Sequence, residues 1–420
     1  MTTVEITKLA NGLTVATDKI VGVESAALGI WVGTGARAET AETNGVAHLL
    51  EHMAFKGTER RSAAAIANEI EAVGGHLNAY TSREVTAYYA RSLKEDAPLA
   101  LDILGDILLN SVFDETELDR ERDVILQEIG QAADTPEDVA HDAFQAAAYP
   151  DQPVGRPILG SPDIIRTIGR DAVAGYMAER YAPETMVLSA TGAVEHARFV
   201  EMAEAIFGGV NRPKPAEPDA ATYTGGEQRI VKDSEQAHLL FGLPAPKFGD
   251  PDYYAGHVLS AIYGGGMSSR LFQEVREKRG LCYSVYSYMS ALTDSGMLGV
   301  YTGTDGAQAG EALNVAIDEL KSVAAGPTAE ETDRAKAQLR ASLLMSREST
   351  AMRAEQLAQQ ILIHGRPLPP EEVRAKVDAV DEAAVAGVAQ RALAGKATLA
   401  MVGPVEDAPD VAALEARMQV

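Results

Sequence analysis

The chain repeats one order of predicted elements, and this repeat restricts the folds open to its 420 residues. Residues 13–35 predict two strands ended by glycine, followed by helices, a strand pair, further helices and a strand. The segment 208–227 holds three prolines and four glycines without apolar periodicity, which predicts a linker. After this linker the order recurs and closes with a strand at 397–403. We therefore expect an α+β protein of two tandem homologous domains, residues 1–207 and 228–420, each a mostly antiparallel sheet packed with helices.

The two predicted halves differ in their chemistry. The first half contains the histidine pair His48 and His52, and the second half has no counterpart of it. Acidic and basic residues alternate through residues 328–362 of the second half, which predicts one long helix there. A metal site, if the chain has one, is therefore expected in the first half alone.

Charge and cysteine content exclude several classes of protein. The net charge is −24, which argues against a nucleic-acid partner because phosphate binding needs a basic surface. An acidic surface would attract basic peptides, although solubility alone explains the charge equally well. Cys282 is the only cysteine, so an intrachain disulfide and a thiolate zinc cluster are impossible. The chain shows neither a signal-peptide pattern nor the run of about 18 apolar residues that spans a bilayer, so we expect a cytoplasmic protein without a membrane partner.

The stretch GVAHLLEHMAFKGT, residues 45–58, contains the pattern His-x-x-Glu-His. On a helix His48 and His52 share one face with their Cβ atoms about 5–6 Å apart. Two such imidazoles can bind one zinc ion at roughly 2.0–2.1 Å. Glu51 lies beside that face, where its carboxylate can take a proton from a zinc-bound water and pass it to a leaving amine. Chance produces this pattern in roughly one such chain in a hundred, but the apolar surround, which includes Phe55, and an acidic helix downstream favour the metal site.

The third metal ligand must come from elsewhere in the chain. The predicted helix ETELDRERDVILQEIGQ offers several carboxylates, namely Glu115, Glu117, Glu121 and Glu128. Glu121 and Glu128 are seven residues apart, so they share a helix face two turns from each other. One of them could bind the metal while the other orients a histidine, and spacing alone does not choose between them. A solvated helix face is the competing interpretation for either residue.

The chain resembles the pitrilysin/insulinase family of zinc peptidases, and most closely its short bacterial forms that are similar to mitochondrial processing peptidase. His-x-x-Glu-His is the known inverzincin signature of such enzymes. The resemblance covers nearly all residues and is carried by long segments: NGVAHLLEHMAFKGT, GGHLNAYTSREVTAYY, ERDVILQEI, GRPILGSPDIIRTI and GGGMSSRLFQEVREKRGLCYSVYSY. It implies one zinc ion per chain and two domains that pair as a clamshell dimer.

The resemblance also implies roles for residues of the first half. It makes Glu128, which lies 76 residues after His52, the third zinc ligand. It makes Glu121 the acid beside a zinc-binding histidine and Glu51 the base that activates water. It further implies an edge strand that pairs with the substrate backbone, formed by Asn78, Ala79 and Tyr80. With Phe55, these are the expected substrate-binding residues.

Two residues of the second half match a further functional pair of the family. Arg276 and Tyr283 have the family's seven-residue spacing. The resemblance implies that the arginine holds a substrate carbonyl and that the tyrosine hydrogen-bonds the oxyanion of the transition state. Because the chain has only two domains, we expect a homodimer in which Arg276 and Tyr283 of one subunit complete the zinc site of the other.

These observations predict a zinc metalloendopeptidase that hydrolyses unfolded peptides in an enclosed chamber, with Glu51 as general base. The rival function is a non-catalytic subunit, or an active subunit that needs a different partner chain, in a heterodimer resembling processing peptidase. Loss of a zinc ligand or of Glu51 would mark a non-catalytic subunit, and all four residues are present.

Overall fold

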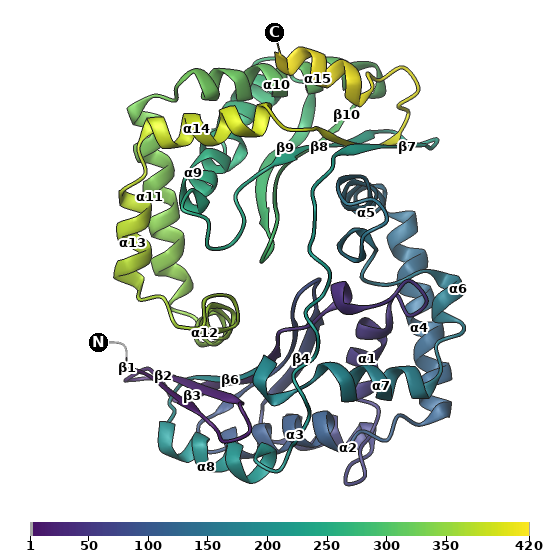
Figure 1. Cartoon of the computed structure of the whole chain (residues 1–420), viewed down its shortest axis with the longest axis vertical. Helices are drawn as coiled ribbons and strands as arrows, with labels where there is room; N and C mark the ends of the chain where they lie inside the picture. Colours follow the sequence, from purple (N-terminus) through teal and green to yellow (C-terminus); the bar gives the residue numbers. More distant parts are fainter. Residues whose placement is uncertain (1–2, 420) are drawn as a thin grey trace. The chain divides into compact units, whose positions relative to one another are not determined.

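A computed structural model of the chain describes residues 3–419, and these residues form two compact units, each built around one sheet (Figure 1). The first unit comprises Met1–Ile129, Arg156–Asp219 and Leu344–Leu368. The second comprises Gly130–Gly155, Ala220–Leu343 and Pro369–Val420. Each unit therefore includes a segment from the opposite half of the sequence.

The sheet of the first unit has six strands in the order β1-β2-β6-β3-β5-β4. Only the pair β2–β6 is parallel. The strand β4 lies at one edge. The bounds are β1 (Thr3–Lys8), β2 (Thr14–Lys19), β3 (Ser25–Val32), β4 (His76–Thr81), β5 (Thr86–Leu93) and β6 (Met186–Gly192).

The sheet of the second unit repeats this arrangement without a counterpart of β1. Its order is β7-β11-β8-β10-β9, and again only one pair, β7–β11, is parallel. The bounds are β7 (Gly226–Val231), β8 (Ala237–Pro244), β9 (Cys282–Ala291), β10 (Gly296–Thr304) and β11 (Thr398–Gly403). The same strand order and strand sense occur twice, which confirms the predicted tandem α+β repeat.

Helices cover both faces of each sheet. The first unit contains α1 (Val46–Ala54), α2 (Ala63–Ala72), α3 (Ala97–Leu109), α4 (Glu115–Asp134, whose end lies in the second unit), α6 (Pro162–Ile165), α7 (Arg170–Arg180), α8 (His196–Phe207) and α12 (Thr350–His364). The second contains α5 (Pro136–Ala148), α9 (Tyr253–Gly264), the π-helical segment η4 (Phe272–Glu277), α10 (Ala309–Ala325), α11 (Ala329–Ser346, whose end lies in the first unit), α13 (Pro370–Asp378), α14 (Glu382–Leu393) and α15 (Val411–Gln419). Short 3₁₀ segments are η1 (Ala36–Ala38), η2 (Pro153–Gly155), η3 (Pro183–Thr185) and η5 (Gly306–Gln308). Among residues 3–419, no helix combines the length and the hydrophobicity that crossing a membrane requires.

The expected single helix over residues 328–362 is wrong, because the chain breaks between α11 and α12. Helix α11 ends at Ser346, and the Ser349 side chain then caps α12 by accepting a hydrogen bond from the Met352 N–H. A side-chain acceptor at this position satisfies a free N–H of a new helix, which favours a break over a continuous helix.

The break lets α12 pack on the sheet of the first unit. Figure 1 shows α12 beside β2, β3 and β6, although it follows the second sheet's strands β9 and β10 in the sequence. Buried Ala354 and Leu357 form an apolar cluster there with Trp31 and Val187, and the Ser189 hydroxyl donates to the Ala354 carbonyl oxygen at 2.8 Å. Burial of a leucine side chain such as that of Leu357 stabilises the contact by roughly 1.5–3 kcal/mol.

Helix α5 is displaced in the opposite direction, from the first half of the sequence to the second unit. It belongs to the first half of the sequence but packs on β7, β8 and β11 of the second unit, where Phe144 lies among Leu240, Met297 and Val402. The compact units therefore differ from the predicted contiguous domains 1–207 and 228–420 by two exchanged segments. Those boundaries stay a prediction about the sequence repeat.

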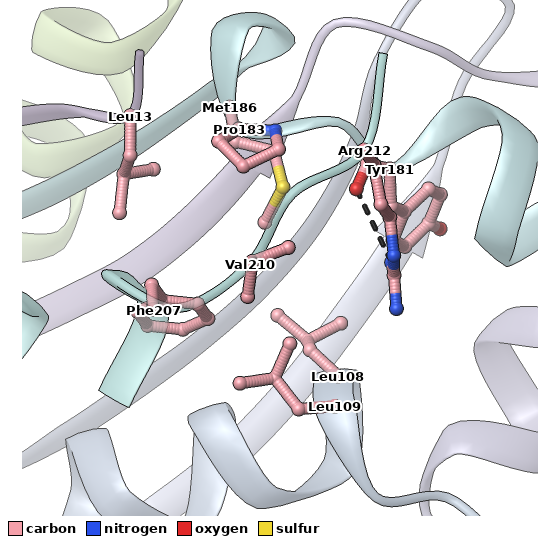
Figure 2. Close-up of a pocket in the computed structure, with 9 residues that line it drawn as sticks. All are labelled: Leu13, Leu108, Leu109, Tyr181, Pro183, Met186, Phe207, Val210 and Arg212. Atoms are coloured by element: carbon pink, nitrogen blue, oxygen red, sulfur yellow. Dashed lines mark hydrogen bonds between the residues drawn. The ribbon is translucent and has the colours of Figure 1, made fainter. Parts of the chain in front are cut away.

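A small apolar cavity in the first unit is too small for a substrate. It measures about 10 Å³ and is lined by Leu13, Leu108 and Phe207, among others (Figure 2). The half-buried Arg212 guanidinium donates to the Tyr181 carbonyl oxygen at 3.2 Å beside it, and partial burial lowers the pKa of Arg212. A cavity of this size holds at most one water molecule.

A buried ion pair fixes α12 to the first sheet. The Arg353 guanidinium donates twice to Asp18 on β2, once from Nε at 2.8 Å, and the two side chains are only 10% and 5% exposed. Breaking such a pair by removing one partner leaves an uncompensated buried charge.

The variant Arg353→Met should therefore lower the free energy of unfolding by about 3–5 kcal/mol. The matched control is Arg166→Met, whose exposed pair with Asp163 should contribute about 1 kcal/mol or less. Urea unfolding followed by circular dichroism measures both. Equal losses in the two variants would contradict the assigned role of the Asp18–Arg353 pair.

Candidate metal centre

Helix α1 presents the predicted histidines on its polar face. Its apolar side chains, such as Leu49 and Leu50, are fully buried in the core of the first unit. His48 and His52 lie one turn apart on the other side, with ring centroids 4.7 Å apart and side chains 13% and 18% exposed. The apolar spacing of the motif thus fixes which face of α1 carries the imidazoles.

Helix α4 brings Glu128 to these two imidazoles. Its Oε2 lies 3.8 Å from the Nε2 atoms of both His48 and His52. One ligand atom from each of the three residues lies within 4.8 Å of the others. Two ligand atoms of a tetrahedral zinc ion lie roughly 3.3–3.4 Å apart, so the three side chains must draw together somewhat to bind one ion.

The hydrogen bonding around this group indicates a cation. Glu128 Oε2 is buried and, within the described part of the chain, has no hydrogen-bond partner. Such an atom costs free energy unless a positive charge or a donor meets it. Burial, aided by the charge of His52, lowers the pKa of His48 to about 4, which keeps that imidazole neutral, the form that binds metals. The three side chains therefore fit a zinc ion.

Glu121 and Lys56 hold His52 in place. His52 Nδ1 lies 3.0 Å from Glu121 Oε2, and the ammonium of Lys56 lies 2.7 Å from Glu121 Oε1. When the His52 Nδ1–H donates to the Glu121 carboxylate, the Nε2 lone pair of His52 is free to bind a metal. The structure thus places Glu121 beside the ring of a histidine and Glu128 close to both rings. Their separate roles at a bound metal stay a prediction.

Glu51 lies beside the same group with a hydroxyl partner. The Thr81 hydroxyl donates to Glu51 Oε2 at 2.6 Å from the end of β4. Burial raises the pKa of Glu51; the Thr81 hydrogen bond and His52 oppose this rise, and Glu128 adds to it. A carboxylate with a raised pKa is suited to accept and release a proton.

Sequence reasoning missed Thr81 and Lys56. Thr81 follows the predicted substrate strand directly, and Lys56 lies four residues after His52, which is the helical spacing for a neighbour on one face. These spacings were the available signals. Neither identifies a partner without the three-dimensional fold.

The predicted substrate-binding residues lie on or near the edge strand β4. The Ala79 N–H bonds to the Asn78 side-chain oxygen at 2.8 Å, and the Tyr80 hydroxyl donates to Glu355 on α12 at 2.9 Å. A groove of about 550 Å³ runs between β3, β4, β5 and α12 beside these residues. Phe55 follows α1 and packs 6.2 Å from the Tyr88 ring, so it contributes to the core.

Arg276 and Tyr283 lie in the second unit and contact each other. The Arg276 guanidinium lies 4.7 Å from the centre of the Tyr283 ring and 4.6 Å from that of Phe272. Tyr283 is 76% exposed. The structure keeps the predicted pair together on η4 and β9, and its action on a zinc site stays a prediction.

Comparison with known proteins extends over almost the whole chain. Residues 14–162 match the family "Insulinase (Peptidase family M16)", and residues 167–339 match the "Peptidase M16 inactive domain". An uncharacterized zinc protease of Streptomyces coelicolor is 40% identical over 415 residues, which cover 96% of this chain and 90% of that protein. An uncharacterized zinc protease of Rickettsia felis is 39% identical, with 95% and 97% covered.

One further relative and one solved structure are similar to nearly the whole chain. The beta subunit of the mitochondrial-processing peptidase of Lentinula edodes is 38% identical over 427 residues, with 97% of this chain and 91% of that subunit covered. The crystal structure of a protease from Helicobacter pylori has the same fold, with a TM-score of 0.90, 21% identity, and 96% and 100% of the two chains covered. Together with the His48–His52–Glu128 group, these matches show that the chain is a zinc protease of the insulinase family, peptidase family M16.

Proposed function

We propose that this zinc protease is an endopeptidase that hydrolyses unfolded peptides inside an enclosed chamber. The observation that carries the proposal is the convergence of His48, His52 and Glu128 with a raised-pKa carboxylate, Glu51, beside them. Strand β4 lies at the edge of its sheet, where an extended peptide can pair with it. In strand addition of this kind the affinity comes from hydrogen bonds to the peptide backbone and does not require one particular amino-acid sequence. It therefore suits unfolded substrates of varied composition.

Each residue of the site in the first unit has its own role in peptide hydrolysis. His48, His52 and Glu128 would hold the zinc ion, which when bound would act as a Lewis acid that makes water more acidic and favours negative charge on a carbonyl oxygen. Glu51 accepts a proton on its carboxylate from the attacking water and returns it to the leaving amine. Thr81 holds that carboxylate in place through its hydroxyl. Asn78, Ala79 and Tyr80 align the peptide along β4.

The proposal extends to a homodimer. Arg276 and Tyr283 of one subunit would reach the zinc site of the other, where the arginine holds a substrate carbonyl and the tyrosine donates to the developing oxyanion. The exposed Tyr283 ring, held against Arg276, supports this role because an exposed phenol is free to meet a second chain or a substrate. The presence of all metal ligands and of Glu51 disfavours a non-catalytic subunit.

The proposals on the charge of the substrate and on the location of the protein in the cell rest on the sequence alone. The net charge of −24 supports a preference for basic peptides, because an acidic surface raises their local concentration. Residence in the cytoplasm stays a prediction.

The variant Glu51→Gln should lower peptide hydrolysis about 10²–10⁴-fold while leaving the zinc content at one ion per chain, because it removes the proton acceptor and no ligand. Cleavage of a fluorogenic peptide and atomic absorption measure the two quantities. Chelator should abolish wild-type activity and added zinc should restore it. Full activity in Glu51→Gln would contradict the role of Glu51.

The variant Glu128→Gln should lose most of its bound zinc, because a neutral amide oxygen binds the ion far more weakly than a carboxylate does. The matched control is Glu115→Gln, an exposed glutamate at the start of the same helix. Metal content after dialysis against a weak chelator compares them. If both variants keep one zinc ion per chain, then Glu128 is not a ligand.

Mixing two inactive variants tests completion of the site by the second subunit. Co-refolded Glu51→Gln and Tyr283→Phe chains should regain about one working site per mixed dimer, because each chain supplies the group that the other lacks. Size-exclusion chromatography confirms the dimer and a peptidase assay measures recovery. No recovery in a verified mixed dimer rules out action between subunits.

A further inference from the structure

Helix α1 begins without a cap of its own. Its N-cap residue, Gly45, has a φ of 97° and no side chain to accept the first N–H groups of the helix. A side chain at Gly45 would also collide with the Leu159 carbonyl oxygen, at 2.9 Å from the added Cβ. The usual capping residues serine, threonine, aspartate and asparagine are therefore excluded from this position.

A glutamate from outside the helix satisfies these N–H groups. Glu39 Oε2 accepts the Gly45 N–H and the Asn44 side-chain amide, and Oε1 accepts the Ala47 N–H, each at 2.8 Å. The Glu39 residue is only 4% exposed. One buried carboxylate thus serves three donors at the start of the helix that carries the metal ligands.

The surrounding loop also makes hydrogen bonds with the main chain of Glu39 and with its partner Asn44. The Arg156 guanidinium donates to the Glu39 main-chain oxygen at 3.0 Å, and the Asn44 amide also donates to the Pro157 carbonyl oxygen at 3.0 Å. Burial raises the pKa of Glu39 to about 7, and the hydrogen bonds from Gly45, Ala47 and Asn44 oppose that rise. The positive end of the α1 dipole also favours the charged form.

The two histidines of the metal centre differ in how they are held. His52 is oriented through its ring by Glu121. His48 Nδ1 is buried and, among the residues that the structure describes, has no hydrogen-bond partner. The position of the His48 imidazole therefore depends on the backbone of the first turn, and His48 directly follows Ala47, whose N–H bonds Glu39.

We propose that Glu39 is a positioning residue of the metal centre, which sets the place of the His48 imidazole by fixing the first turn of α1. Glu39 orients His48 by binding backbone N–H groups at the start of its helix. Glu121 orients His52 by a hydrogen bond to the imidazole ring itself. The inference rests on the metal centre and not on the proposed substrate, chamber or dimer.

The test compares zinc affinity with stability in matched cap variants. Glu39→Gln keeps the size of the side chain but replaces one acceptor oxygen with a donor that faces N–H groups. Ser62→Ala is the control, because the Ser62 hydroxyl caps the neighbouring helix α2 by accepting the Ala65 N–H. Both variants should lower the thermal midpoint of the metal-free protein.

Only Glu39→Gln should weaken zinc binding, by about 10–100-fold, the range found when the partners of metal ligands are lost. Competition with a chromogenic chelator measures the dissociation constant without any peptide substrate. The visible spectrum of the Co²⁺-loaded protein reports ligand geometry and should change in Glu39→Gln alone.

An unchanged zinc affinity and Co²⁺ spectrum in a destabilised Glu39→Gln protein would overturn the inference and reduce Glu39 to a plain helix cap. If Glu39→Gln does not fold, Asn44→Ala removes one of the three donors more gently and should weaken zinc binding less, yet measurably. Unchanged affinity in that variant would equally overturn the inference. None of these measurements uses peptidase activity. A failure of this inference can therefore be told apart from a failure of the proposed function.

Discussion

The packing of helix α1 is the constraint on which the metal centre depends. Leucine and methionine side chains bury one side of this helix in the core, so the opposite side holds two imidazoles and a carboxylate at fixed spacing. Ionisable groups in a half-buried position require partners. Helix α4 supplies two of them, Glu121 to a histidine ring and Glu128 between the rings. The core therefore determines the geometry of the site before any metal binds.

The two copies of the repeat share a fold but differ in the side chains that could take part in catalysis. Both units have the same strand order and a single parallel pair, yet the group of side chains that could hold a metal ion, within residues 3–419, lies in the first unit. The second unit keeps an arginine–tyrosine contact instead. A repeated fold thus carries different side chains in its two copies, and the activity follows these side chains rather than the fold.

Local patterns in the sequence were sufficient for the repeat, for the zinc-binding motif and for the strand at residues 76–81, whose place at a sheet edge came only from the family resemblance. They were insufficient wherever a long-range contact decides. Glu121 and Glu128 share one helix face, so spacing could not separate the ligand from the acid beside it. The break at Ser349 was missed because helix-forming residues flank it on both sides, and the packing of α12 on the first sheet follows from tertiary burial of Leu357 against Trp31. Glu39 was missed because two of its three donors are backbone N–H groups, which leave no mark in the sequence, and the third, the Asn44 amide, follows no motif.

The exchanged helix α12 has a consequence for synthesis on the ribosome. The first sheet has all its strands once Gly192 is made, but α12 ends at His364, 172 residues later. At roughly 5–20 residues per second, the translating ribosome needs roughly 10–35 s to cover that distance. Throughout this interval Trp31 and Val187 lack the apolar side chains of α12 that cover them in the folded chain. Until α12 is made, the face of the first sheet on which it packs therefore lacks the apolar cover that α12 provides.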